Sequence, residues 1–284
     1  MQQALLEQGK IGESKHEAKA ATGAKAPNGI YSFRTMETYL YQGCKFAKWA
    51  KAEHGCKTLE QAKPYAKEYL EHGIARSLSA STLSTQRAAI CKLYRISADD
   101  VDIKLPARNR RDITRSRAAA TNDKHFSVKN NAGIIAFCRA TGLRRHELAS
   151  LRQNQICTKA GGRVELQNVK GKGGKIRNIA VISGMEAAVI KYADAASQER
   201  VFRKVPQNMD VHSYRREYAA EMYRTQQRHL QRTEGRVLEK LPSSELYHCR
   251  KDKAGIVYDK RIMRYVSRQL GHNRISVIAG HYLG

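Results

Sequence analysis

Apolar residues in the first third of the chain recur at steps of three and four, the spacing that puts side chains on one face of a helix. The clearest series is Met36, Tyr39, Leu40, Gly43, Phe46, Ala47 and Ala50. A second helix is expected after Thr58, which begins a capping-box pattern, and Pro64 should kink or restart it. A third helix is expected after Ser79 or Ser81. Because no alternating strand pattern interrupts these stripes, residues 29–105 are predicted to form a helical domain.

Helical spacing returns at residue 126, with a strand pattern inside it. Two segments rich in Val and Ile, 163–169 and 176–182, flank a glycine-rich turn and predict a β-hairpin. The expected helices cover about 127–140, 145–151, 184–196, 212–231 and 259–270, with a last one from Ile275. The fold class is therefore predicted to be mainly α with a small antiparallel β-sheet, in two domains.

Two stretches of the chain lack apolar periodicity. Residues 1–28 mix Lys, Glu, Gly and Ala and are expected to be a flexible N-terminal arm. Residues 106–125 are expected to be a basic linker leading to the second domain, residues 126–284. The linker contains five arginines, namely Arg108, Arg110, Arg111, Arg115 and Arg117. We expect them to run along DNA phosphates, with a solvated charged loop as the alternative.

The charge balance favours a polyanionic partner. The 284 residues include 52 Lys and Arg against 26 Asp and Glu, which leaves a formal net charge of +26 at pH 7. So large a surplus opposes compact folding through self-repulsion unless a polyanion is the normal partner, and it is typical of nucleic-acid-binding proteins. The basic residues are spread along the whole chain, which favours wrapping a nucleic-acid backbone over a basic tail. Charge alone does not separate this class from a ribosomal or generic nucleic-acid-binding protein.

The sequence offers no segment for insertion into a membrane or for secretion. No apolar run is long enough to span a bilayer, and the N-terminus lacks the apolar core of a signal peptide. The six cysteines form no C-x-x-C pair, and they are Cys44, Cys56, Cys91, Cys138, Cys157 and Cys249. Reduced thiols are therefore expected, with neither a disulfide framework nor a zinc site. The expectation is a cytoplasmic, nucleoid-associated protein that needs no metal or cofactor.

Four short motifs in the second half of the chain carry residues suited to phosphate chemistry. They are Thr141-Gly142-Leu143-Arg144 with Glu147 three residues later, His212-Ser213-Tyr214-Arg215, Leu270-Gly271-His272, and Tyr282. In this order, they resemble the arginine box, the H-x-x-R box and the L-G-H…Y element of the tyrosine recombinase (phage-type integrase) family. The resemblance covers residues 130–284. The helices and linker that precede these motifs resemble the family's helical core-binding (SAM-like) domain. The resemblance therefore implies a core-binding domain followed by a C-terminal catalytic domain.

Arg144 and Arg215 are the candidates for binding a phosphate. A guanidinium stays charged at any working pH and donates two parallel hydrogen bonds, so two of them on separate elements can clamp the non-bridging oxygens. His212 lies three residues before Arg215 and would share its helix face, and histidine exchanges protons near neutral pH. The resemblance implies that His212 assists the tyrosine or holds the phosphate. Glu147 is expected to orient Arg144 or its neighbours, with an ordinary helix-surface glutamate as the alternative.

The resemblance also implies a nucleophile and a proton donor. Tyr282 would attack the phosphodiester while His272 bonds the phosphate, although their separation of ten residues is one more than is usual in the family. Lys172, at the hairpin tip, fits the family's mobile lysine, which protonates the departing 5′ oxygen, and Lys175 is the second choice. The glycine-rich run around them lacks the spacing of a P-loop, so ATP is not implied. Two nearby tyrosines are expected to serve packing, namely Tyr258 and Tyr265.

Taken together, the resemblance implies a site-specific DNA recombinase that works through a covalent 3′-phosphotyrosyl intermediate. Integration and excision of a mobile genetic element is the expected setting, ahead of resolution of chromosome or plasmid dimers. The expected partners are double-stranded DNA, further copies of the chain that form a homo-tetramer on paired sites (a monomer or dimer off DNA), and a DNA-bending accessory protein. Two alternatives stay open: a type IB topoisomerase-like enzyme and a DNA-binding regulator that has lost catalysis. Residues 228–252 exceed a minimal family member, and an extra DNA contact or an extra protein contact is expected there.

Overall fold

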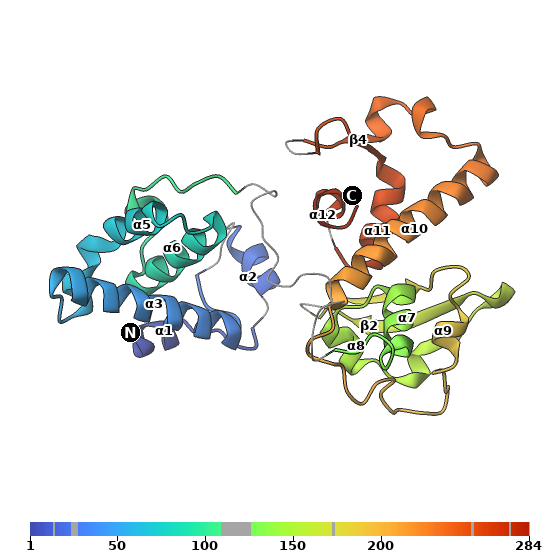
Figure 1. Ribbon diagram of the computed structural model, residues 1–284, viewed down its shortest axis with the longest axis horizontal. Coiled ribbons are helices and arrows are strands. Elements are labelled where there is room, and N and C mark those ends of the chain that lie inside the picture. Colours follow the sequence, from blue (N-terminus) through green and yellow to red (C-terminus); the bar gives the residue numbers. More distant parts are fainter. Residues whose placement is uncertain are drawn as a thin grey trace. The chain divides into compact units, whose positions relative to one another are not determined.

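The computed structural model describes residues 1–13, 15–23, 28–108, 126–171, 174–250, 253–272 and 274–283. The chain divides into two compact units, Met1–Thr114 and Arg115–Gly284, and each is described by itself (Figure 1). The division falls inside the stretch expected to be a linker. Four of the five linker arginines lie outside the described residues, namely Arg110, Arg111, Arg115 and Arg117. None of the helices described is both long and apolar enough to cross a membrane.

The N-terminal unit is helical, as its periodicity predicts. Its helices are α1 (Gln2–Leu6), α2 (Lys15–Thr22), α3 (Phe33–His54), α4 (Leu59–Ala62), α5 (Ala66–Ala75) and α6 (Ala80–Tyr94), with 3-10 turns η1 (Lys63–Tyr65) and η2 (Asp99–Val101). Ser32 and Ser79 cap α3 and α6 by accepting backbone N–H bonds, and Thr58 forms the expected capping box. The turn containing Pro64 separates α4 from α5, because proline cannot continue the hydrogen-bond ladder of a helix. Phe46, Leu70, Leu83 and Ile90 are buried in this unit.

The first ten residues differ from the expected flexible arm. Leu5 on α1 is 1 % exposed, and α1 contacts α3 and α6. The Gln8 Nε2 donates a hydrogen bond of 2.7 Å to the Lys92 carbonyl, and Gly9 pairs with Ile30. One buried leucine, one side-chain hydrogen bond and one backbone bridge hold this segment, and such contacts leave no periodic apolar pattern in the sequence.

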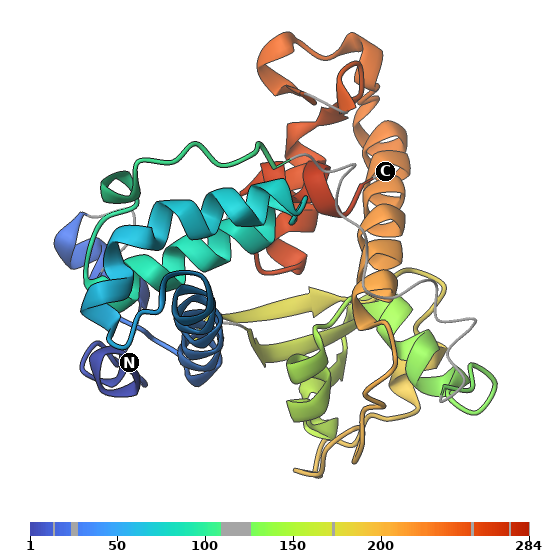
Figure 2. The same cartoon turned by 60° about the vertical axis from the view of Figure 1, so that its left-hand side comes forward.

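The C-terminal unit combines helices with two small antiparallel sheets (Figure 2). Its helices are α7 (Ala132–Thr141), α8 (Arg145–Ser150), α9 (Ala187–Ile190), α10 (Val211–Glu234), α11 (Lys260–Gln269) and α12 (Ile275–His281). One sheet has the order β1 (Ile156–Thr158), β2 (Val164–Lys170) and β3 (Ile176–Ala180), and the other pairs β4 (Leu246–His248) with β5 (Val257–Asp259). Short 3-10 turns are η4 (Gln153–Gln155), η5 (Ala160–Gly162), η7 (Leu238–Lys240) and η8 (Ser243–Glu245). The fold class is therefore mainly α with small antiparallel sheets, as predicted.

The β2–β3 hairpin is confirmed, with Glu165 opposite Ala180 and Lys170 opposite Ile176. The predicted helix over 184–196 is wrong in extent, because only Ala187–Ile190 is helical. Tyr192 follows directly and packs edge-on against Phe137, with ring centroids 5.7 Å apart. Aromatic packing against the core outweighs the helical preference of this alanine-rich segment. Strands β1, β4 and β5 were not predicted, since three residues are too few to show an alternating pattern.

Close packing brings the first motif to the centre of the C-terminal unit. Gly142 ends α7 with φ of 60°, and a Cβ there would lie 2.4 Å from the Tyr218 ring. Tyr218 on α10 is fully buried and donates a hydrogen bond of 2.8 Å to the Ala180 carbonyl of β3. Only glycine fits at position 142, so this residue sets both the end of α7 and its distance from α10.

Candidate active site

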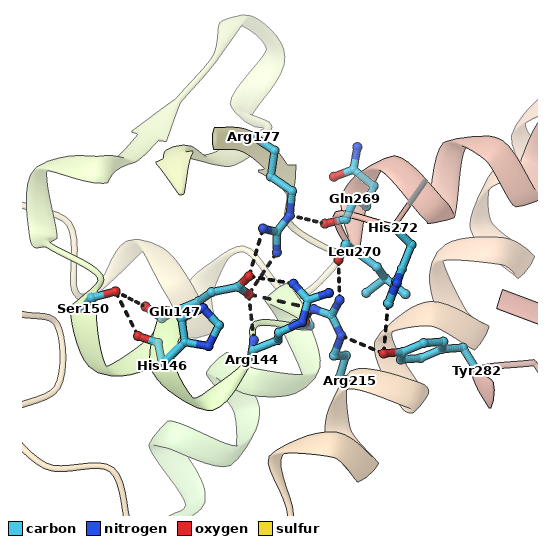
Figure 3. A network of polar contacts seen from close by, with 11 residues as sticks. Arg144, His146, Glu147, Ser150, Arg177, Arg215, Gln269, Leu270, His272 and Tyr282 are labelled. Atoms are coloured by element: carbon cyan, nitrogen blue, oxygen red, sulfur yellow. Dashed lines mark hydrogen bonds and ion pairs between the residues drawn. The ribbon is translucent and has the colours of Figure 1, made fainter. Parts of the chain in front are cut away.

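Three guanidinium groups surround one buried carboxylate in the C-terminal unit (Figure 3). The carboxylate is Glu147 on α8, which is 1 % exposed, and the guanidinium groups belong to Arg144, Arg177 and Arg215. We call these four residues the arginine cluster. Burial alone would raise the pKa of Glu147, but hydrogen bonds and charge from Arg177 and Arg144 outweigh it and hold the pKa at about 2. Glu147 is therefore ionised at neutral pH and lies in the centre of the cluster, not on a helix surface.

Arg144 occupies the position just before α8. Its backbone N–H donates to Glu147 Oε2 at 2.8 Å, and its Nη1 donates to Glu147 Oε1 at 2.8 Å. Its side chain is 16 % exposed, whereas that of Arg215 is fully buried. Of the two predicted arginines, Arg144 is therefore the one that solvent reaches.

Arg177 on β3 belongs to the cluster but is not among the residues predicted from the sequence. Its Nη1 and Nη2 donate to the two oxygens of Glu147 at 2.9 Å each, and its Nε donates to the Gln269 carbonyl at 2.8 Å. Gly171 and Gly271 approach this guanidinium so closely that a Cβ would lie 2.8 Å and 3.1 Å from its Nη1. A signal was present, because Arg177 and Ile179 are two residues apart and share the buried face of the strand.

Arg215 on α10 connects the cluster to the C-terminal segment. Its Nη1 donates to the Gly142 carbonyl and its Nη2 donates to the Leu270 carbonyl. Its Nε donates to the Tyr282 Oη at 3.2 Å, and its Cζ lies 5.6 Å from the centre of the tyrosine ring. Three motifs that are distant in the sequence therefore meet at one guanidinium.

Tyr282 and His272 form the other side of this site. The His272 Nε2 lies 3.1 Å from the Tyr282 Oη, and the two rings are tilted with centroids 5.3 Å apart. Arginine can only donate, so the phenol oxygen accepts from Arg215 and its own proton can go to His272. Burial, together with the positive charges of Arg215, Arg144 and other cations, lowers the pKa of His272 to about 4. The imidazole is therefore neutral at pH 7 and can accept that proton in a hydrogen bond.

His212 lies one turn before Arg215, as predicted, but the network does not include it. The residue is exposed, and none of the hydrogen bonds among the described residues involves its imidazole. Its pKa is lowered, first by partial burial of the ring and then by the charge of Arg215. The ring is thus close enough to the cluster for the charge of Arg215 to act on it.

The remaining predicted residues are distributed as follows. Lys172 lies outside the described residues. Lys175 is exposed beyond the hairpin tip, where its carbonyl accepts a 2.7 Å hydrogen bond from the Gly171 N–H. Arg108 is exposed in the N-terminal unit and lines a groove of about 600 Å³. The two rival tyrosines, Tyr258 and Tyr265, pack against the core of the C-terminal unit.

Comparisons with known proteins give structural likeness only. No family model matches the sequence, and no curated protein matches it either. The structure is similar to the XerH site-specific recombinase bound to a palindromic difH substrate in a post-cleavage complex, at 14 % identity and a TM-score of 0.48, covering 89 % of this chain and 77 % of that one. It is also similar to XerH in a pre-cleavage complex with difH, at 14 % identity and a TM-score of 0.47, covering 96 % and 87 %. The Tn1549 transposon integrase in complex with transposon right end DNA is similar at 14 % identity and a TM-score of 0.37, covering 88 % and 95 %. At these values, the assignment of an activity depends on the residues of the site.

Proposed function

We propose that this protein is a site-specific DNA recombinase of the tyrosine type, which cuts and rejoins DNA through a covalent 3′-phosphotyrosyl bond at Tyr282. One observation carries the proposal. The Tyr282 phenol oxygen lies within hydrogen-bond distance of Arg215 Nε and His272 Nε2, at the edge of the arginine cluster. A phenol, a neutral imidazole and buried guanidinium groups in contact are the parts that transfer of a phosphoryl group to tyrosine requires.

In the proposed reaction, the phenol oxygen attacks the phosphorus of one phosphodiester, and the bond from phosphorus to the 5′ oxygen breaks. The phenol gives up its proton, and the departing 5′ oxygen takes up a proton. The tyrosyl phosphodiester conserves the energy of the broken bond, so the 5′-hydroxyl of another strand can reverse the step with Tyr282 as the leaving group. No water or nucleotide is consumed.

The charge of the arginine cluster suits this chemistry. Attack by a phenol oxygen that loses its proton puts two negative charges on the reacting phosphate group. Three guanidinium groups against one carboxylate leave two positive charges in the cluster. Preorganised charge in a site shielded from water stabilises such a transition state more than it would in water. Arg144, the more exposed arginine, is assigned the first contact with the phosphate.

The roles of the peripheral residues are part of the proposal. His272 takes up the phenol proton as Tyr282 attacks and then donates it in a hydrogen bond to the phosphate, while Tyr282 becomes part of the phosphodiester. Lys172 protonates the 5′ oxygen, and His212 supports the phosphate from the outer side of α10. Arg108, Arg110, Arg111, Arg115, Arg117 and Lys175 contact the DNA backbone. Two duplexes would be joined in a homo-tetramer, with integration and excision of a mobile element as the setting.

Covalent trapping tests the proposed function. The protein is incubated with fragmented genomic DNA, denatured, and the 3′ ends that remain attached to protein are sequenced to locate the site. A nicked duplex carrying that site should then form an adduct with the wild-type protein, and the attached peptide should contain Tyr282. We expect Tyr282→Phe to form no adduct while binding the duplex normally, and Tyr265→Phe, the matched control, to form it. An adduct of equal yield with Tyr282→Phe would exclude this nucleophile.

The same material separates the alternatives. A type IB topoisomerase would relax supercoiled plasmid that lacks the mapped site, whereas a recombinase should need that site. A regulator without catalysis would bind the duplex and leave no attached 3′ ends.

A further inference from the structure

The segment between α10 and α11 reaches the C-terminal helix that carries Tyr282. Lys253 lies between strands β4 and β5, and its Nζ donates a hydrogen bond of 2.6 Å to the Ala279 carbonyl. It also donates to the Leu283 carbonyl. These two carbonyls lie on either side of Tyr282 in the sequence. A lysine therefore holds the last turn of α12 at the point where the nucleophile is attached.

Helix α12 needs such support, because it is short and ends in weak helix-forming sequence. It has seven residues, and Gly280 lies in its last turn. Isolated helices of this length are unstable, and glycine costs about 1 kcal/mol relative to alanine in a helix. Ile278, Ala279 and Leu283 are buried and attach the helix to the core. Burial of these side chains does not satisfy the terminal carbonyls, which lack partners within the helix and attract a positive charge.

The segment that carries Lys253 is itself tied to the neighbouring helices by an ion network. Arg236, just beyond α10, donates to both oxygens of Asp259 at 2.5 Å and 3.0 Å and also to Glu245. We call these three residues the Arg236 network. Asp259 in turn accepts the Arg261 and Ile262 backbone N–H bonds at the start of α11. Because α11 leads into His272, the Arg236 network ties the β4–β5 hairpin to the helix that precedes the His272 imidazole.

From these contacts we propose that Lys253 is a positioning residue for Tyr282: it clamps the last turn of α12 so that the phenol oxygen stays at Arg215 and His272 of the same chain. This proposal rests on the proposed function. It also assigns residues 228–252 and the β4–β5 hairpin to support of the helix that carries Tyr282. Lys253 touches no reacting atom, so its effect should be confined to the presentation of the nucleophile.

The test compares Lys253→Met with Lys260→Met. Lys260 is the first residue of α11, directly after the β4–β5 hairpin, and its Nζ donates to the Ser244 carbonyl at 2.7 Å. Each variant loses one positive charge and the lysine's hydrogen bonds to backbone carbonyls. Any effect of the lost charge on DNA affinity should therefore be equal in the two variants. In single-turnover reactions with saturating nicked duplex, we expect Lys253→Met to form the Tyr282 adduct about 10- to 100-fold more slowly than Lys260→Met. Lys253→Arg, which keeps the charge and the donors, should stay within a few-fold of wild type.

Hydrogen exchange of the DNA-free protein provides a readout that does not depend on activity. Peptides covering residues 275–283 should exchange faster in Lys253→Met than in Lys260→Met, while peptides from α7 and α10 exchange alike. Equal exchange in 275–283, or equal adduct rates in the two variants, would overturn the clamp. If the wild-type protein forms no adduct, the proposed function fails and hydrogen exchange alone decides the clamp. Should Lys253→Met not fold, Lys253→Gln, which keeps one donor, is measured in the same way.

Discussion

The arginine cluster and the Arg236 network are both ion networks at helix ends in the C-terminal unit, yet their charge balances are opposite. The cluster sets three guanidinium groups against one carboxylate, and the network sets two carboxylates against one guanidinium. A network that only supports the fold gains nothing from surplus buried positive charge, because desolvation of an unpaired ion is costly. The surplus in the cluster therefore favours an anionic ligand, whereas the Arg236 network satisfies its own groups within the fold.

The largest expected effect breaks the cluster at its centre. Arg215→Lys keeps a positive charge but loses the planar fork, and a lysine cannot reach Gly142, Leu270 and Tyr282 together. We expect adduct formation to fall about 1000-fold, because a single preorganised donor is worth about 100- to 1000-fold in rate. The single-turnover rate on the nicked duplex measures this. Affinity for the duplex should change by less than about threefold, and a loss of affinity alone would reduce Arg215 to a DNA-backbone contact.

The next prediction separates the two networks directly. Arg177→Met and Arg236→Met each remove one arginine from a carboxylate, and each should lower the free energy of unfolding by about 3 kcal/mol. Arg177→Met should also slow adduct formation about 100-fold, because Glu147 is then left to pull on Arg144 and Arg215. Arg236→Met should slow adduct formation less than about tenfold, since Arg236 touches no residue of the arginine cluster and acts on Tyr282 indirectly, through the β4–β5 hairpin and α11. Urea unfolding and single-turnover kinetics test both, and equal rates in the two variants would remove the distinction.

The last effect is confined to acid pH: the arginine cluster makes the free energy of unfolding depend on pH. The folded protein holds the Glu147 pKa at about 2, below its ordinary value of 4.5. The ionised Glu147 carboxylate therefore contributes roughly 3 kcal/mol to the free energy of unfolding. This contribution is fully present above pH 4.5 and is lost as the pH falls from 4.5 toward 2. Urea unfolding at several pH values in this window should show a steeper loss in wild type than in Glu147→Gln. Parallel curves would mean that the cluster does not hold this carboxylate.

Much of the fold could be predicted because local chemistry determines it. Ser32, Thr58 and Ser79 cap helices where the sequence places them, and the Val- and Ile-rich arms form the hairpin. The motif order brought Arg144, Arg215, His272 and Tyr282 into consideration, and the structure places these four together. Their meeting could be expected only from resemblance, since residues 67 positions apart share no local signal.

The remaining features depend on tertiary contacts that leave little trace in the sequence. Arg177 shares a strand face with Ile179, but a charged residue can be assigned to a buried face only when its partner, here Glu147, is known. Lys253 caps a helix from 26 residues away, so no capping rule based on neighbouring residues could find it. His212 was expected in the network from its spacing to Arg215, but helix periodicity fixes only the face of the helix and leaves the side-chain rotamer undetermined.

The two glycines that enclose the Arg177 guanidinium restrict how this centre can change over evolutionary time. A methyl group at position 171 or 271 would collide with a side chain already tied to Glu147 and Gln269, so it has no room to step aside. A side chain at position 171 requires that the arginine shorten at the same time, which means two coordinated replacements on different elements. At position 271 the φ of 66° disfavours any residue other than glycine in addition. Descendants of this protein should therefore inherit or lose the two glycines and the arginine as a unit.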